Sequence, residues 1–186
     1  MSGRLRIIGG EWRGRRLRVA DSPGLRPTGD RVRETLFNWL QGRIAGASVL
    51  DLFAGTGALG LEALSRGAAH AVFVERARRA ARHLQDHLEQ LGASDRGQVW
   101  CGDAGRYPGA DAGPFDIVFL DPPFALALQQ PMLNRVLAEG WVQPEGVVYV
   151  ESDARAAALD LPADWAVTRE TRAGDVHGVL VGPRPD

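Results

Sequence analysis

The stretch "SVLDLFAGTGALGLEALSRG", residues 48–67, joins a strand pattern to a helix pattern through a glycine-rich turn. "SVLDLF" is a short apolar run, which is typical of a buried strand, and "ALGLEALSR" has helical spacing and ends before Gly67. A strand that passes through a glycine turn into a helix is the first half of a β-α-β unit. The stretch therefore predicts a parallel sheet.

The same alternation continues along the chain. Strands are predicted at residues 70–75, 98–102, 115–120 and 146–152, with helices at 76–91 and 130–139. The tail, "WAVTRETRAGDVHGVLVG" (165–182), instead predicts two strands around a turn at 173–175, which form an antiparallel hairpin. Together these patterns predict an α/β fold: a doubly wound, Rossmann-like, seven-stranded and mostly parallel sheet with an antiparallel C-terminal hairpin.

The N-terminal part has a different character. "LRIIGGEWRGRRLRV" (5–19) predicts a small polar hairpin, and residues 30–41 predict a helix that Thr28 or Asp30 could cap. Residues 1–45 hold ten Arg and four acids, a balance of +6, whereas the whole chain carries −1. All 22 basic residues are Arg, so a coding bias explains the choice of Arg but not its crowding here. We predict a basic hairpin-plus-helix extension that binds a polyanion.

Length and composition set the broad class. A chain of 186 residues with 45% hydrophobic residues predicts one domain, divided into the extension (1–45) and a cofactor-binding core (46–186). No apolar stretch approaches the ~20 residues of a membrane span, so we expect a soluble, cytoplasmic protein. Cys101 falls in a predicted buried strand, where a thiol is usually inert. His83 and His87 lack a third ligand and are interpreted as a solvated helix face, with no metal.

The glycine turn predicts a nucleotide-type cofactor site. Gly55, Gly57 and Gly60 satisfy G-x-G-x-x-G after a strand, and Glu75 at the end of the next strand could accept hydrogen bonds from ribose hydroxyls. A dinucleotide and S-adenosylmethionine both fit. Asp51 would suit an ammonium group and repel a pyrophosphate, which favours S-adenosylmethionine. In "GDA", residues 102–104, Asp103 could read an adenine amino group.

Several motifs in a fixed order carry a family resemblance. "DLFAGTGALGLEALSRGA", "VFVE", "GDA" and "DIVFLDPPF" resemble the motifs of class I methyltransferases that act on amines. With "RIIGGEWRGRRL" and "GLRPTGDRVRETLFNWL", nearly the whole chain resembles the bacterial 16S ribosomal RNA (guanine-N2) methyltransferases. The stretch "TRAGDVHGVLV" departs from that family because it lacks the aromatic residues of the last strand.

The resemblance gives the motif "DPPF", residues 121–124, a chemical role. The Asp121 carboxylate and the Pro122 carbonyl would accept hydrogen bonds from an exocyclic amine and direct its lone pair at the methyl group. Pro123 would stiffen the loop, and Phe124 would stack on a base that is splayed out of any duplex. An isolated Asp-Pro-Pro without this context is as readily a loop acid followed by a stop.

The resemblance also implies sites and partners. The expected cofactor is S-adenosylmethionine, and the expected partner is 16S ribosomal RNA within a small subunit or an assembly intermediate; we expect a monomer that binds no membrane. The cofactor residues predicted are Asp51, Phe53, Ala54, Gly55, Thr56, Gly57, Glu75, Arg76, Asp103 and Ala104. The nucleic-acid residues predicted are Arg4, Arg6, Trp12, Arg13, Arg15, Arg16, Arg26, Arg31 and Arg33.

Three other functions are open at this point. An adenine-N6 methyltransferase shares the loop chemistry and differs only in its N-terminal segments and its product. A nicotinamide-dependent oxidoreductase would need a substrate-binding portion that the residues after Phe124 do not provide. A noncatalytic RNA-binding module would explain the arginines but not the acids predicted at strand ends, Asp51, Glu75 and Asp121.

Overall fold

The structure is a computed structural model that describes residues 3–19 and 29–185. The chain divides into two compact units, Met1–Tyr107 and Pro108–Asp186. Within the described residues, no helix is long and apolar enough to cross a membrane. The predicted division into residues 1–45 and 46–186 stays a prediction.

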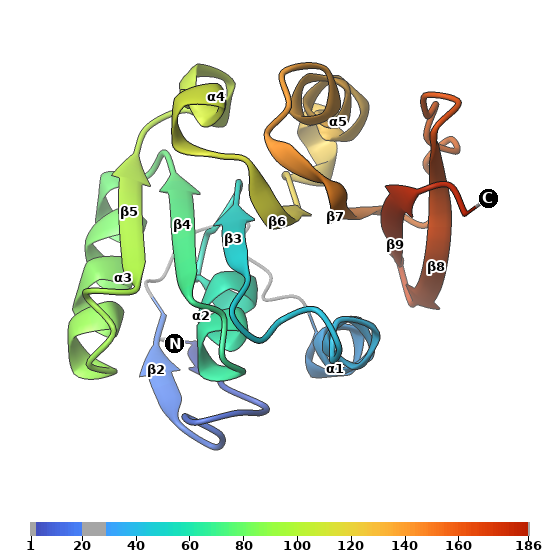
Figure 1. Cartoon of the computed structure of the whole chain (residues 1–186). Helices are drawn as coiled ribbons and strands as arrows, with labels where there is room; N and C mark the ends of the chain where they lie inside the picture. Colours follow the sequence, from blue (N-terminus) through green and yellow to red (C-terminus); the bar gives the residue numbers. More distant parts are fainter. Residues whose placement is uncertain (1–2, 20–28, 186) are drawn as a thin grey trace. The chain divides into compact units, whose positions relative to one another are not determined.

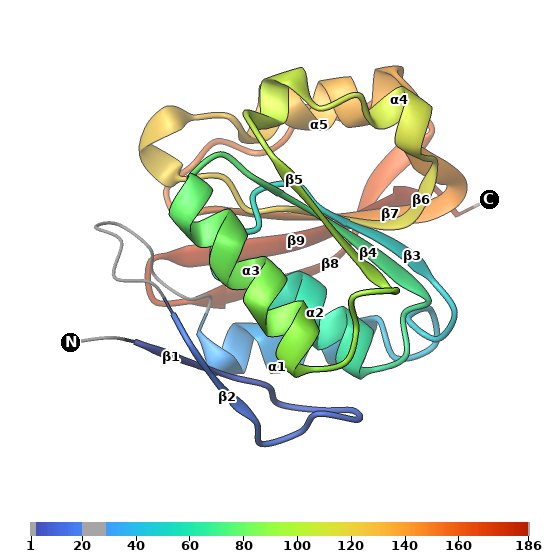
Figure 2. The same cartoon turned by 90° about the vertical axis from the view of Figure 1, so that its left-hand side faces the viewer.

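The first unit contains three parallel strands, β3 (Ser48–Asp51), β4 (His70–Glu75) and β5 (Gly97–Cys101), with β4 in the middle (Figure 1). Three helices accompany them, α1 (Asp30–Trp39), α2 (Ala58–Ser65) and α3 (Arg78–Gln90). The helix α2 packs on β3 and β4, and α3 packs on β4 and β5 (Figure 2). The four residues between the ends of β4 are apolar and buried, as expected for a strand that is buried on both faces.

The N-terminal extension is hydrogen-bonded to α2. Its strands β1 (Arg4–Arg6) and β2 (Arg16–Arg18) pair antiparallel. The Ile8 and Gly9 N–H groups donate to the Glu62 carboxylate at 2.8 Å each, and the Trp12 N–H donates to Ser65 Oγ at 2.9 Å. Gly10 has φ 76°, and a Cβ there would collide with the Ser65 carbonyl, so this close approach requires glycine. The extension is thus built into the first unit.

The second unit contains four strands and their helices. The strands β6 (Phe115–Leu120) and β7 (Val142–Asp153) are parallel. The strand β9 (Val176–Pro183) pairs antiparallel with β7, and β8 (Trp165–Ala173) pairs antiparallel with β9. The helix α5 (Gln129–Ala138) packs on β6 and β7, and α4 (Gly109–Ala112) is a single turn.

Within the two units the strand orders are β5-β4-β3 and β6-β7-β9-β8. The predicted fold class, a mostly parallel seven-stranded sheet with an antiparallel C-terminal hairpin, is confirmed. Every predicted helix and strand is present, with most ends within two residues. The short helix α4 and the 3-10 turns η1 (Ala104–Arg106) and η2 (Phe124–Leu126) were not predicted, because three or four residues carry no periodic signal.

Two local predictions were wrong. Cys101 is exposed, because β5 is the outermost strand of the sheet and Cys101 is its last residue. Asp30 does not cap α1: the N-cap is Gly29, and Asp30 is the first helical residue, where its carboxylate pairs with Arg33 at 2.6 Å. Thr28, the other predicted cap, lies outside the described residues.

Candidate active site

The glycine turn lies between β3 and α2 in the first unit. Gly57 has φ 79° and serves as the N-cap of α2, a left-handed conformation that favours glycine. A Cβ on Gly60 would collide with the Phe73 ring on β4, so the third glycine of the motif lets helix and strand approach closely. The turn is therefore shaped as the motif predicts.

Glu75, at the end of β4, holds the glycine turn in place. Its Oε2 accepts the Gly55 N–H at 2.9 Å, and its Oε1 accepts the Ala77 N–H at 2.7 Å. Each carboxylate oxygen can accept more than one hydrogen bond. The half-buried Glu75 carboxylate thus positions the glycine turn and retains acceptor capacity for hydroxyl groups of a ligand.

Asp51 is more deeply placed than the sequence indicated. It is 2% exposed, and its Oδ2 accepts the Gly60 N–H in the first turn of α2 at 2.9 Å. Asp51 therefore holds the start of α2 in place, in addition to the ligand-binding role that the sequence predicts for it. Asp103 follows β5, is exposed, and accepts the Gly105 N–H through Oδ1 at 2.9 Å.

These three carboxylates share one edge of the sheet. Asp51, Glu75 and Asp103 stand at the carboxyl ends of β3, β4 and β5, which are parallel neighbours. A set of carboxylate acceptors suits a ligand that is rich in donors, such as ammonium, hydroxyl or amino groups. The site thus fits S-adenosylmethionine better than a pyrophosphate. Of the other predicted cofactor residues, Ala54 and Ala104 are buried, Phe53 and Thr56 are half-buried, and Arg76 is exposed.

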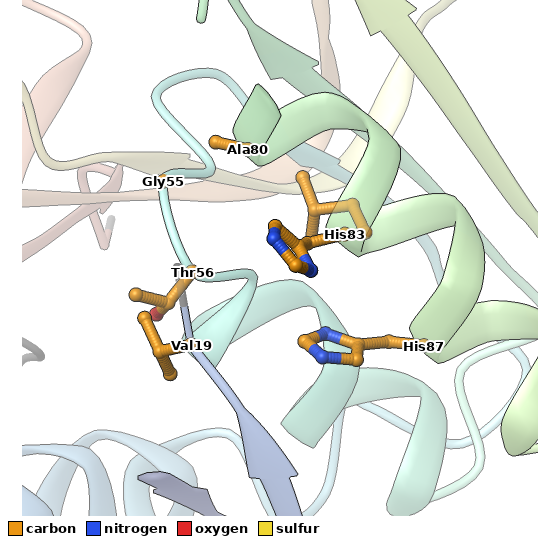
Figure 3. Close-up of a pocket in the computed structure, with 7 residues that line it drawn as sticks. Val19, Gly55, Thr56, Ala80, His83 and His87 are labelled. Carbon is orange, nitrogen blue, oxygen red and sulfur yellow. The ribbon is translucent and has the colours of Figure 1, made fainter. Parts of the chain in front are cut away.

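A small pocket adjoins the glycine turn on the side of α3 (Figure 3). The His83 and His87 rings lie one helical turn apart, with centroids 6.4 Å apart. The lining residues are Val19, Gly55, Thr56, Ala80, His83, Leu84 and His87. The described residues contain no group of three His, Cys, Asp or Glu side chains that could hold a metal.

His87 corrects the interpretation of this helix face as solvated. It is 3% exposed, and its Nε2 donates to the Arg18 carbonyl of β2 at 2.9 Å. Burial lowers the pKa of His87, so the ring is neutral with its proton on Nε2. His87 therefore ties the N-terminal hairpin to α3.

The motif "DPPF" lies in the second unit, directly after β6. Asp121 is half-buried and Pro122 is buried, whereas Pro123 and Phe124 are exposed, Phe124 at 37%. The Pro123 carbonyl accepts the Leu126 N–H at 3.0 Å, which closes the turn η2. Ala127 then adopts φ 48°, an uncommon conformation for a residue with a side chain. The loop thus carries an exposed aromatic ring three residues after a carboxylate at a strand end.

The family described as Conserved hypothetical protein 95 matches residues 5–182 of the chain. The chain belongs to this family. It is 49% identical over 175 residues to Ribosomal RNA small subunit methyltransferase D of Escherichia coli strain K12, a match that covers 94% of this chain and 88% of that protein. The protein of the same name from Haemophilus influenzae is 40% identical over 178 residues, covering 94% and 91%.

Solved structures agree with this family membership. The structure of yhhF from Escherichia coli superimposes with a TM-score of 0.86 and 41% identity, covering 99% of this chain and 100% of that chain. The structure of HI0767 from Haemophilus influenzae gives a TM-score of 0.80 and 35% identity, covering 97% and 99%. The resemblance identified from the motifs is thus confirmed.

Within this family member, most of the predicted nucleic-acid residues are exposed on the extension and on α1. On β1 and β2, arginines alternate with buried Leu5 and Leu17. The strand register places Arg4 opposite Arg18 and Arg6 opposite Arg16. The exposed members of the predicted set are Arg4, Arg6, Arg13, Arg15, Arg16 and Arg31, and Arg26 lies outside the described residues.

Two predicted nucleic-acid residues are wrong because they are interior. Trp12 is 2% exposed and lies under the Arg96 guanidinium, 5.3 Å from its ring centroid, so it offers no face to a base. Arg33 is 1% exposed; it donates to the Arg6 carbonyl at 2.9 Å and approaches Glu62 at 3.8 Å. Tertiary packing uses both residues to dock the extension.

The sequence analysis missed a buried polar pair beside "DPPF". The Tyr149 hydroxyl donates to Glu151 Oε2 at 3.0 Å, and the two residues are 0% and 4% exposed. A signal for it was present in the sequence, since Glu151 is the penultimate residue of the predicted strand "GVVYVES" and Glu75 is the last residue of "HAVFVE".

Proposed function

We propose that this protein transfers a methyl group from S-adenosylmethionine to the exocyclic N2 of a guanine in 16S ribosomal RNA. The observation that carries the proposal is the 49% identity, over 94% of the chain, to a protein named Ribosomal RNA small subunit methyltransferase D. We further propose that the substrate is a small ribosomal subunit or its assembly intermediate, in the cytoplasm, and that the enzyme acts as a monomer.

In this proposal the first unit holds the cofactor. Glu75 accepts hydrogen bonds from ribose hydroxyls with the lone pairs that the Gly55 and Ala77 N–H groups leave over. Asp103 accepts a bond from the adenine amino group, and Asp51 keeps the glycine turn in shape through Gly60. The cofactor, when bound, supplies an electrophilic methyl group on a sulfonium.

The motif in the second unit prepares the amine. The N2 lone pair of guanine is delocalised into the ring, so the free amine is a weak nucleophile. Acceptors on its two N–H bonds, the Asp121 carboxylate and the Pro122 carbonyl, favour a tetrahedral nitrogen. With the cofactor bound, the nitrogen would use this lone pair to form the new N–C bond as the C–S bond breaks with its electrons on sulfur, and it would release one N–H proton to solvent water. Stacking on the exposed Phe124 ring holds the base, which is typically worth ~1–3 kcal/mol.

The extension supplies phosphate contacts. Arginines face each other across β1 and β2, at Arg4 and Arg18 and at Arg6 and Arg16. Like charges directly opposite on a strand pair are destabilising. A polyanion bound over the hairpin would relieve this repulsion, which favours a phosphate backbone as the partner.

The test is product analysis with unmodified small ribosomal subunits and labelled S-adenosylmethionine. We expect one methyl group on N2 of a single guanine, identified by mass after digestion. Asp121→Ala should reduce turnover by ~10²–10³-fold, a scale taken from preorganised polar groups in other active sites, with cofactor affinity unchanged. Asp175→Ala is the matched control, because Asp175 is an exposed acid in the β8–β9 turn of the same unit. Methyladenine as the sole product would favour the adenine-N6 alternative, and an active Asp121→Ala enzyme would remove the motif from catalysis.

A second measurement tests the extension. Arg4→Gln combined with Arg16→Gln should lower RNA affinity and flatten its salt dependence by ~0.7–0.9 per lost phosphate contact. Arg82→Gln, an exposed arginine on α3, is the control for loss of charge alone. An unchanged salt slope in the double variant would argue against phosphate contacts at the hairpin.

A further inference from the structure

The carboxyl ends of β6 and β7 bring two carboxyl groups together. The register pairs Leu120 with Val150, so the next residues along these parallel strands are Asp121 and Glu151. Laterally paired residues of parallel strands project to the same face of a sheet. Asp121 is also close enough to act electrostatically on both Glu151 and Tyr149.

Glu151 is buried, and polar groups surround its side chain and its carbonyl. The Tyr149 hydroxyl, two residues earlier on the same face of β7, donates to Glu151 Oε2. The strand β9 makes room for it with Gly178, where a Cβ would collide with the Tyr149 hydroxyl. From α5, Gln129 donates to the Glu151 carbonyl at 3.4 Å, so an uncharged amide lies on that side.

The groups that act on Glu151 among the described residues are neutral or acidic. Asp121 follows β6, Tyr149 is on β7, Gly178 is on β9 and Gln129 is on α5. His177, which precedes Gly178 on β9, pairs with Glu170 of β8 at 3.2 Å. Two adjacent carboxylates repel each other in a buried setting, so a shared proton is the stable arrangement.

We propose that Glu151 is a positioning residue for Asp121: a neutral carboxylic acid that donates its proton in a hydrogen bond to the Asp121 carboxylate. Tyr149 holds one oxygen of Glu151, which leaves the other to carry the proton. Asp121 thereby keeps a fixed orientation and the negative charge that the target amine requires. This inference rests on the proposed function of "DPPF".

The titration behaviour of Glu151 agrees with this arrangement. Burial, together with the negative charge of Asp121, raises the pKa of Glu151 to about 8, against an opposing effect of the Tyr149 hydrogen bond. Glu151 is therefore mainly protonated at neutral pH. Above that pH the donor is lost and the two carboxylates repel each other.

The kinetic test compares pH profiles of kcat for methyl transfer. In the wild type, kcat should fall as the pH rises through about 8. Glu151→Gln keeps a donor but cannot ionise, so it should retain activity at neutral pH and lose this alkaline decline. Glu151→Ala should lower kcat about tenfold at neutral pH, the equivalent of one hydrogen bond, without changing cofactor affinity.

Tyr149→Phe is an independent test, because it should shift the pH of the alkaline decline in a defined direction. The Tyr149 hydrogen bond stabilises the ionised form of Glu151, so its removal should move the alkaline decline to higher pH. Superimposed profiles for wild type and Glu151→Gln would overturn the proposal. Glu151→Gln as inactive as Glu151→Ala would overturn it too, because the amide donor would then have failed to replace the acid.

A substrate-free measurement separates this inference from the proposed function. Carbon-13 NMR of carboxyl-labelled Glu, assigned by its loss in Glu151→Gln, should show Glu151 titrating near 8. Asp121→Asn removes the neighbouring charge and should lower that midpoint. A Glu151 midpoint in the ordinary acidic range, or one insensitive to Asp121→Asn, would overturn the inference whatever the substrate. A protein with the expected titration that methylates no guanine would overturn only the proposed function.

Discussion

Three carboxylates of the first unit and Glu151 of the second unit are satisfied in opposite ways. In the first unit, Glu62, Glu75 and Asp51 each accept backbone N–H groups, and Glu62 also pairs with Arg66 at 2.8 Å. In the second unit, Glu151 has a neutral hydroxyl and another carboxyl group for neighbours. Charged acceptors that face donors build a fixed scaffold. Acceptors that face each other must hold a proton, and that proton makes the second set sensitive to pH.

The largest effect should come from the most donor-rich carboxylate of the first unit. Glu62 is fully buried and lies between the hairpin backbone, Arg66 and Arg33. Glu62→Ala would leave buried donors and a buried guanidinium without this acceptor, so we expect the free energy of unfolding to fall by ~3–5 kcal/mol in chemical denaturation. Glu89→Ala, on the exposed face of α3, is the control and should change stability little.

Equal stability of the two variants would contradict the description of the first unit. If Glu62→Ala matched Glu89→Ala in stability, the buried donors around Glu62 would have other partners. The first unit could not then be described as a scaffold fixed by acceptor-to-donor pairing.

A smaller effect is expected at Glu75, where the same pairing meets the proposed ligand. Glu75→Ala removes acceptors from Gly55, Ala77 and the proposed ribose hydroxyls. Calorimetry should show S-adenosylmethionine affinity reduced by ~1.5–3 kcal/mol, or roughly 10- to 100-fold. Unaltered affinity would assign Glu75 to loop structure alone.

In the second unit, the space around Tyr149 can be tested by a pair of glycines on β9. A methyl group on Gly178 would meet the Tyr149 hydroxyl, whereas one on Gly182 would meet only ordinary van der Waals neighbours, Val147 and Thr168, at 3.4 and 3.5 Å. We expect Gly178→Ala to lower the free energy of unfolding by ~1–3 kcal/mol, since overpacking displaces the buried hydroxyl. Gly182→Ala should be close to neutral. Equal effects would show that the Tyr149 site has room to adjust.

The last expected effect is a gradual change of the free energy of unfolding with pH. The folded-state pKa of Glu151 is raised from 4.5 to about 8, so between these values the folded protein holds a proton that the unfolded chain has released. The stability from this group is fully present below pH 4.5 and is lost as the pH rises through 8, with a slope on the order of 1 kcal/mol per pH unit.

Two variants isolate this slope. Glu151→Gln should remove this slope from its own free energy of unfolding, so the difference in that free energy between wild type and variant should change with pH. Glu139→Gln should not, because the hydrogen bond from Arg135 lowers the pKa of Glu139, and its contribution therefore changes only in more acidic solution. If the free energies of unfolding of the wild type and Glu151→Gln changed with pH in parallel, Glu151 and Asp121 would not be coupled.

Sequence reasoning recovered the fold because its signals are local. Apolar runs and helical spacing identified the strands and helices from Ser48 to Pro183, and the glycine motif located the turn after β3. It also placed Glu75 and Asp121 at strand ends, since a carboxylate at the end of an apolar run is visible in the residues themselves; their roles stay predictions. Short elements such as α4 and η2 were beyond it, because their few residues carry no period.

The sequence by itself thus determined the order of the elements, the glycine turn and the position of "DPPF". Only the tertiary structure decided which polar residues are interior. Arg33 is the same residue type as the exposed arginines, and Trp12 lies among them in the sequence, yet contacts with Glu62 and Arg96, both far along the chain, bury Arg33 and Trp12. Glu151 meets Asp121 only because β6 and β7 pair in one register. Burial and charge coupling depend on neighbours distant in sequence, and a linear pattern does not contain those distances.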